Sequence, residues 1–89
     1  MTQLEQTIIA NARQEAAAVL SYYKLLQDGQ PNADDADDFI GHYHALTTLL
    51  MLAYQVNSGM SAEGVRALQA IEKEHSRALN SVRGEDWES

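Results

Sequence analysis

The chain has 89 residues without a cysteine, and its 13 acidic and 6 basic residues give a formal net charge of −7. That length is enough for one domain, and the lack of cysteine excludes a disulfide framework and a thiolate zinc site. An acidic surface repels nucleic acid and anionic lipids over about 8 Å at physiological salt. We therefore expect no direct contact with nucleic acid or membrane, and a protein partner that presents a basic, nucleic-acid-binding surface.

The start of the chain, Met1–Glu5, lacks the basic region and apolar core of a signal peptide. The longest apolar run, at 49–54, is far shorter than the roughly 20 residues of a membrane-spanning helix. These two features predict a soluble, cytoplasmic protein.

The first predicted helix covers about residues 3–28. Thr2 and Glu5 have the spacing of a capping box, in which each side chain bonds the free backbone N–H of the other residue. Gly29 marks the end, because glycine adopts the left-handed conformation at a helix end without strain. Apolar side chains recur inside the helix at spacings of three and four, which places them on one stripe: Ile9, Ala12, Ala16, Val19, Tyr23, Leu26.

The second predicted helix covers about residues 34–57 and begins with four aspartates, whose charges meet the positive end of the helix dipole. Its apolar stripe consists of Ala36, Phe39, Tyr43, Leu46, Leu50 and Ala53. From 46 to 56 the helix is apolar nearly all the way round, and a helix of that kind is covered on every side.

The third predicted helix covers about residues 62–83, with Ser61 as its cap and Gly84 at its end. Its apolar stripe consists of Leu68, Ile71, His75, Ala78 and Val82. Helices joined by such short connections run antiparallel to their sequence neighbours. The sequence therefore predicts an all-α, antiparallel three-helix bundle that forms a single domain at 1–84, followed by a short acidic tail at 85–89.

The apolar second half of helix 34–57 predicts self-association, because two alanine-rich neighbours cover only part of it. A two-fold homodimer is the commonest arrangement that would cover the rest, and a higher oligomer is the alternative assembly. The residues expected to mediate this contact are Leu49, Met51, Leu52, Tyr54 and Val56. The other interpretation is that the first and third helices enclose the second one completely.

Two acidic segments are the candidate partner-binding surface. Helix capping explains some of the aspartates, but four in five positions exceed what a cap requires. Together with a tryptophan, a favoured hot-spot residue, they predict contact with a basic protein surface through Asp34, Asp35, Asp37, Asp38, Glu85, Asp86 and Trp87. The competing interpretation is a solvated acidic face without a partner.

A second hypothesis is an oligomer that sequesters an anionic signalling nucleotide between its subunits. The candidate residues are Tyr22, Lys24, Arg66, Lys73 and Arg77. The competing interpretation is that the cations of the third helix complement its dipole. A structural or regulatory helical dimer is a third hypothesis.

Catalytic and metal-binding motifs are not evident in the sequence. His42 and His44 point about 200° apart on a helix, so they cannot chelate one ion, and Asp38 is the expected partner of His42. His75 lies on an apolar stripe, where it is either a neutral structural residue or a pH-responsive contact. We expect neither an enzyme nor a bound metal or other cofactor.

A small, acidic, cysteine-free and all-helical chain without motifs resembles the anti-defence proteins of phages, such as the anti-CRISPR proteins. The resemblance is one of size, charge and class, and it transfers no functional residues. It implies an inhibitor that occupies a surface of a host complex.

Overall fold

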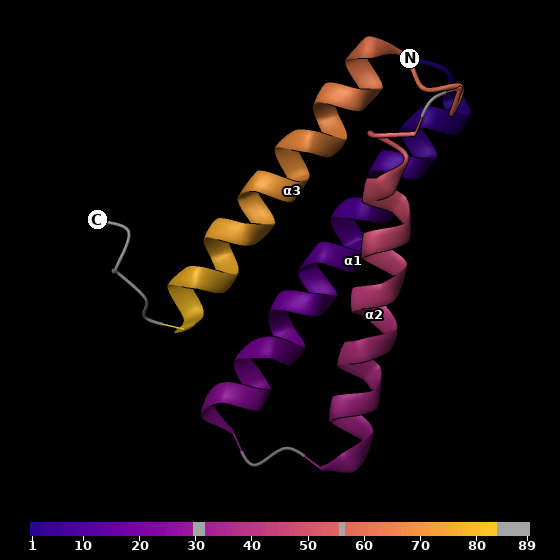
Figure 1. Cartoon of the computed structure of the whole chain (residues 1–89). Helices are drawn as coiled ribbons and strands as arrows, with labels where there is room; N and C mark the ends of the chain where they lie inside the picture. Colours follow the sequence, from indigo (N-terminus) through magenta and orange to yellow (C-terminus); the bar gives the residue numbers. More distant parts are fainter. Residues whose placement is uncertain (30–31, 56, 84–89) are drawn as a thin grey trace.

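The computed structural model describes residues 1–29, 32–55 and 57–83, which form the helices α1 (Gln3–Asp28), α2 (Ala33–Met51) and α3 (Ala62–Arg83). The described residues form an all-α bundle of three helices, as the periodicity predicts (Figure 1). In the part of the chain that the structure describes, no helix is both long and apolar enough to cross a membrane.

Side-chain caps define where the first two helices begin. The predicted capping box is present at α1, where the Thr2 hydroxyl accepts from the Glu5 N–H and the Glu5 carboxylate accepts from the Thr2 N–H. Asn32 and Asp35 form a second capping box at α2. Each box satisfies backbone donors that a helix start otherwise leaves without partners.

The predicted end of the second helix is wrong: α2 ends at Met51, whereas the sequence predicted helix to residue 57. From Leu52 to Tyr54, each backbone N–H donates to the carbonyl three residues earlier, which tightens the chain into turns. Asn57 and Gly59 then have φ angles of 64° and 86°, in the left-handed region that these residues favour. The apolar run therefore ends in a turn, and that turn leads the chain back toward α3.

The central helix is α1, and not the second helix as the sequence had suggested. α2 and α3 both pack along α1, whereas they touch each other over only a short stretch. Figure 1 shows α2 running antiparallel to α1, while α3 runs in the same direction as α1 and diverges from α2. Apolar periodicity shows which face of a helix is buried but not which neighbour buries it, and this explains the error.

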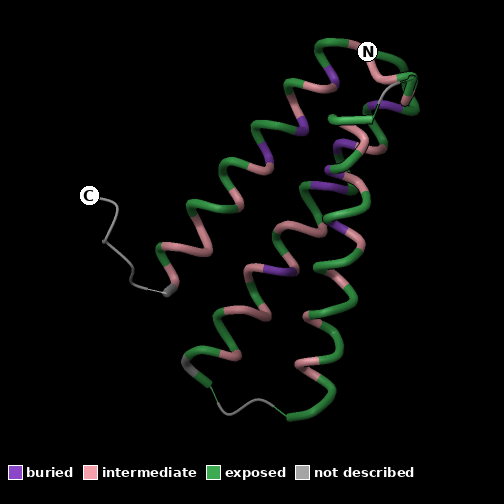
Figure 2. Tube along the Cα trace, in the orientation of Figure 1, coloured by how far each residue is buried: buried purple, intermediate pink, exposed green. Residues whose placement is uncertain are grey.

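The core is concentrated where the three helices converge. We call residues 3–19, 46–55 and 57–71 the closed end, and residues 20–29, 32–45 and 72–83 the open end. Among the described residues, the buried apolar side chains all lie in the closed end (Figure 2): Ile9, Ala12, Val19, Leu46, Leu50, Leu68 and Ile71. At the open end, α1 and α2 continue as a pair. Tyr23 of α1 stacks on Phe39 of α2, with centroids 5.9 Å apart, and Phe39 stacks on Tyr43 of the same helix, with centroids 6.0 Å apart.

Candidate functional site

A groove between α2 and α3 is a concave surface that combines apolar and polar side chains. It has a volume of about 240 Å³. The residues that line it, which we call the α2–α3 groove, are Tyr43, Leu46, Thr47, Leu50, Met51, Tyr54, Glu72, His75 and Ser76. The groove exists because α2 and α3 each pack on α1 and leave the space between themselves uncovered.

The α2 wall of the groove is apolar and exposed. Phe39, Leu46 and Leu50 contribute to the core that α2 shares with α1. A second stripe, rotated about 100° around the helix, consists of Ile40, Tyr43, Thr47 and Met51 and continues into the following turn with Tyr54. Its large side chains retain high exposed fractions: 51% for Ile40, 46% for Tyr43, 52% for Met51 and 60% for Tyr54. We call these five residues the groove stripe.

The α3 wall is more polar and contains two titratable side chains. Glu72 accepts a hydrogen bond from the Tyr54 hydroxyl, which ties the two walls together at one point. That hydrogen bond raises the pKa of Tyr54, because the bond requires the protonated phenol. His75 lies half-buried against α1, and burial lowers its pKa, so the neutral imidazole is favoured.

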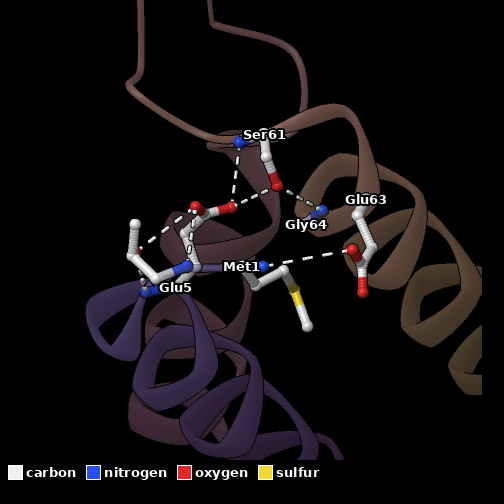
Figure 3. A network of polar contacts seen from close by, with 6 residues as sticks. Met1, Glu5, Ser61, Glu63 and Gly64 are labelled. Atoms are coloured by element: carbon white, nitrogen blue, oxygen red, sulfur yellow. Dashed lines mark hydrogen bonds and ion pairs between the residues drawn. The ribbon is translucent and has the colours of Figure 1, made fainter.

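A polar network fixes the position of α3 at the closed end (Figure 3). The buried Glu5 carboxylate accepts from the Ser61 hydroxyl at 2.7 Å and from the Ser61 N–H at 2.9 Å, and the Gly64 N–H donates to the Ser61 hydroxyl at 3.1 Å. The Ser61 hydroxyl, followed by the Ser61 N–H, lowers the pKa of Glu5 from 4.5 to about 2. Because Glu5 is also in the α1 capping box, one carboxylate joins the starts of two helices.

The sequence did not predict the link between Glu5 and Ser61. A capping box accounts for Glu5 completely, so no signal indicated that its second oxygen reaches a residue 56 positions away. The groove stripe did leave a signal, since its members recur at spacings of three and four on a helix that already has an apolar face. From the sequence alone, that repetition indicates a helix that is apolar all round and does not identify a second, distinct face.

The predicted partner of His42 is wrong. Its ring nitrogen Nδ1 lies 2.6 Å from Glu15 of α1, whereas the sequence had suggested Asp38 on the same helix. The ring also stacks on Tyr22 at 5.6 Å, and the Tyr22 hydroxyl donates to Asp38. Contacts across the helix pair therefore replace a contact along one helix, because α1 lies close enough to offer a carboxylate.

The four aspartates of α2 have different roles. Asp35 completes the capping box, and Asp38 accepts from Tyr22, whereas Asp34 and Asp37 are exposed. Among the described residues, the Met1 ammonium pairs with Glu63 and the His42 ring contacts Glu15, so none of the four aspartates is paired with a cation. Capping thus accounts for one of them, and the start of α2 remains strongly acidic.

Several predicted site residues fall in the closed end or outside the described residues. Leu49 and Leu52 pack against the core of their own chain, whereas Met51 and Tyr54 are exposed in the groove stripe. Val56, together with the tail residues Glu85, Asp86 and Trp87, lies outside the described residues.

The candidate anion-binding residues do not meet within one chain. Tyr22 lies beside Asp38, whose charge raises the pKa of the phenol, and this is an acidic environment. Lys24 belongs to the last turns of α1 and Arg66 to the first turns of α3, at opposite ends of the bundle (Figure 1). Lys73 and Arg77 are exposed on α3. A nucleotide site between subunits stays a prediction.

Metal ligands do not cluster in the described part of the chain, where no group of three or more His, Cys, Asp or Glu residues could hold an ion. No family model, curated protein or solved structure matches this chain.

Proposed function

We propose that this chain is a non-enzymatic protein-interaction module, of the inhibitor or regulator type, that docks a protein helix in the α2–α3 groove. The observation that carries the proposal is the groove stripe, a helix face of large apolar side chains left about half exposed. Contiguous apolar surface of this kind is characteristic of a protein-binding site.

The shape of the groove favours a helix as the docked element. Its α2 wall carries apolar residues at spacings of three and four, and an amphipathic helix presents side chains at the same spacing. Its α3 wall consists of Glu72, His75 and Ser76. Small-molecule pockets usually enclose about 300–1,000 Å³ and bury most of the ligand. The α2–α3 groove is smaller than this range, at about 240 Å³, and its rim residues are half exposed.

The acidic start of α2 supplies a second element of recognition. Its aspartates have no cationic partner among the described residues, and the whole chain has a net charge of −7. Charge of one sign on a rim mainly accelerates association with a partner of the opposite sign, and salt weakens the effect. Apolar burial in the groove would hold the docked helix, and the aspartates would form a separate contact that selects basic partners.

A site-specific photo-crosslinker tests whether the groove docks protein. We would place a photoreactive amino acid at Tyr43, in the groove, and in a control variant at Leu4, which is 70% exposed but lies on α1 outside the groove. On irradiation in cells, position 43 should yield a discrete protein adduct that position 4 does not. Equal or absent adducts at the two positions would contradict the proposal.

A further inference from the structure

We propose that the helix docked in the α2–α3 groove is α2 of a second copy of this chain. This inference rests on the proposed docking function of the groove and identifies the occupant. The two copies would exchange α2 faces across a two-fold axis, so that each groove is complete only when the other copy is present.

The packing of the three helices leaves one position of a four-helix arrangement open. In a four-helix bundle each helix packs on two neighbours and does not pack on the helix diagonally opposite. Here α1 packs on both α2 and α3, whereas α2 and α3 touch each other over only a short stretch and diverge (Figure 1). A helix placed in the groove would contact α2 and α3 and would lie diagonally opposite α1.

The chain itself contains a helix that fits this position. The occupant must present an uncharged apolar stripe at spacings of three and four, and the groove stripe of α2 is such a stripe. Among the described residues, its large side chains remain about half exposed. In a two-fold contact the same surface serves both copies, so one pairing buries both groove stripes.

Two-fold symmetry also determines the register of this contact. A two-fold axis along the helices would place the two aspartate-rich α2 starts side by side, and like charges repel at such a contact, so we infer an axis perpendicular to the helices. The two α2 helices then run antiparallel, with Thr47, at the middle of the groove stripe, facing the second copy's Thr47. Tyr43 then lies beside the second copy's Met51, and Ile40 lies beside the second copy's Tyr54. Each pairing joins apolar side chains that are about half exposed in the single chain.

The distribution of charge permits this pairing despite the net charge of −7. The groove stripe contains no ionisable acid or base other than the tyrosine phenols. Glu72, on the α3 wall, already accepts a hydrogen bond from Tyr54. The antiparallel arrangement places the two acidic α2 starts at opposite ends of the helix pair, where they stay apart from each other and accessible to a basic partner.

Sedimentation of the intact protein and of two variants tests the proposal. We expect the protein to sediment at twice its chain mass of 9.9 kDa, and Met51→Glu to sediment at the single-chain mass. Leu4→Glu, which places the same charge on an exposed apolar position outside the groove, should remain dimeric. A single-chain mass for the unsubstituted protein at submillimolar concentration would overturn the proposal.

A pair of cysteine variants tests the register and does not depend on how Met51→Glu folds. The chain has no native cysteine, and Thr47 and Thr48 are adjacent, exposed positions that point about 100° apart. Thr47→Cys should form a covalent dimer on mild oxidation, because the two thiols face each other, whereas Thr48→Cys should stay monomeric on a denaturing gel. Equal crosslinking of the two variants would overturn the proposed pairing.

The outcomes separate this proposal from the one on which it rests. A single-chain mass combined with a Tyr43 adduct to a different protein would retain the docking function and reject the second copy as occupant. A single-chain mass without any Tyr43 adduct would reject both proposals.

Discussion

The closed end and the open end of the molecule are built from the same three helices but differ in how the helices meet. At the closed end all three helices share a core, and Glu5 joins the start of α1 to the start of α3 through Ser61. At the open end α1 and α2 remain paired through aromatic stacking, while α3 diverges and leaves the α2–α3 groove beside it.

This difference indicates that stability and binding depend on different parts of a small domain. A chain of this size buries a limited share of its surface, about 60–65% of what the unfolded chain exposes. Its fully buried apolar side chains are gathered in the closed end, so stability should originate there. The groove stripe is then free to contribute to binding and contributes little to folding.

Leucine truncations at the two ends should show the largest contrast. Leu68 is fully buried at the closed end, whereas Leu79 is partly buried on the diverging half of α3. Leu68→Ala should lower the free energy of unfolding by about 2–5 kcal/mol, and Leu79→Ala by about 1 kcal/mol, because a cavity forms only in a closed core. Urea denaturation of both variants measures the difference. Equal losses in the free energy of unfolding would contradict the view that stability originates at the closed end.

Alanine substitutions of two glycines, one at each end of the molecule, should change the stability in opposite directions. A Cβ at Gly41 of α2 meets nothing within 4 Å, so Gly41→Ala should raise the free energy of unfolding by about 1 kcal/mol through helix propensity. A Cβ at Gly64 would lie 2.4 Å from Oε2 of Glu5 and 2.9 Å from Cε of Met60. Gly64→Ala should therefore destabilise the protein, since Glu5 cannot move without losing its bonds to Ser61. The midpoint of thermal unfolding should rise for Gly41→Ala and fall for Gly64→Ala. Stabilisation by both substitutions would show that Glu5 and Met60 can move aside for the added Cβ without loss of stability.

Acid should weaken the closed end through Glu5. The pKa of Glu5 is about 2 in the folded chain against an ordinary value of 4.5, so the unfolded chain takes up this proton first as the pH falls. The stabilisation is complete above pH 4.5 and is lost as the pH falls to about 2. Glu5→Gln should lack this stabilisation. The difference in the free energy of unfolding between this variant and the unsubstituted protein should therefore shrink as the pH falls from 4.5 to about 2. A difference that stays constant with pH would contradict the role of the carboxylate, and Ser61→Ala should give an intermediate slope.

A smaller pH effect is expected at the groove. Burial lowers the pKa of His75 below its ordinary value of 6.5, so the unfolded chain binds this proton more readily and stability should fall as the pH drops below 6.5. Glu72 and Tyr43 line the groove beside His75, and Arg13 and Glu74 line the depression on its other side. His75→Leu should remove this slope between pH 7 and pH 5, as measured by urea denaturation. An unchanged slope in the variant would assign it to other groups.

Helix positions were readable from the sequence where local chemistry determines them. The capping box of Thr2 and Glu5, together with Gly29, predicted the bounds of α1, and Ser61 with Gly84 predicted those of α3. Both sets of bounds agree with the structure. The end of α2 was missed because Leu52 and Ala53 are as apolar as a helix interior, although they pack against the core from a turn. The order of packing around α1, and with it the groove, was not readable because periodicity carries no information about which neighbour covers a face.

Amide hydrogen exchange along α3 tests the contrast between the two ends most directly. We would compare residues 66–71 with residues 75–79, which both lie inside the helix, in Met51→Glu, where we expect no second copy to cover the groove. Amides 66–71 should exchange at least about tenfold more slowly, through global unfolding, while amides 75–79 should exchange through local opening of the diverging half. Equal rates in the two segments, both set by global unfolding, would show that α3 is held along its whole length and would contradict an open end.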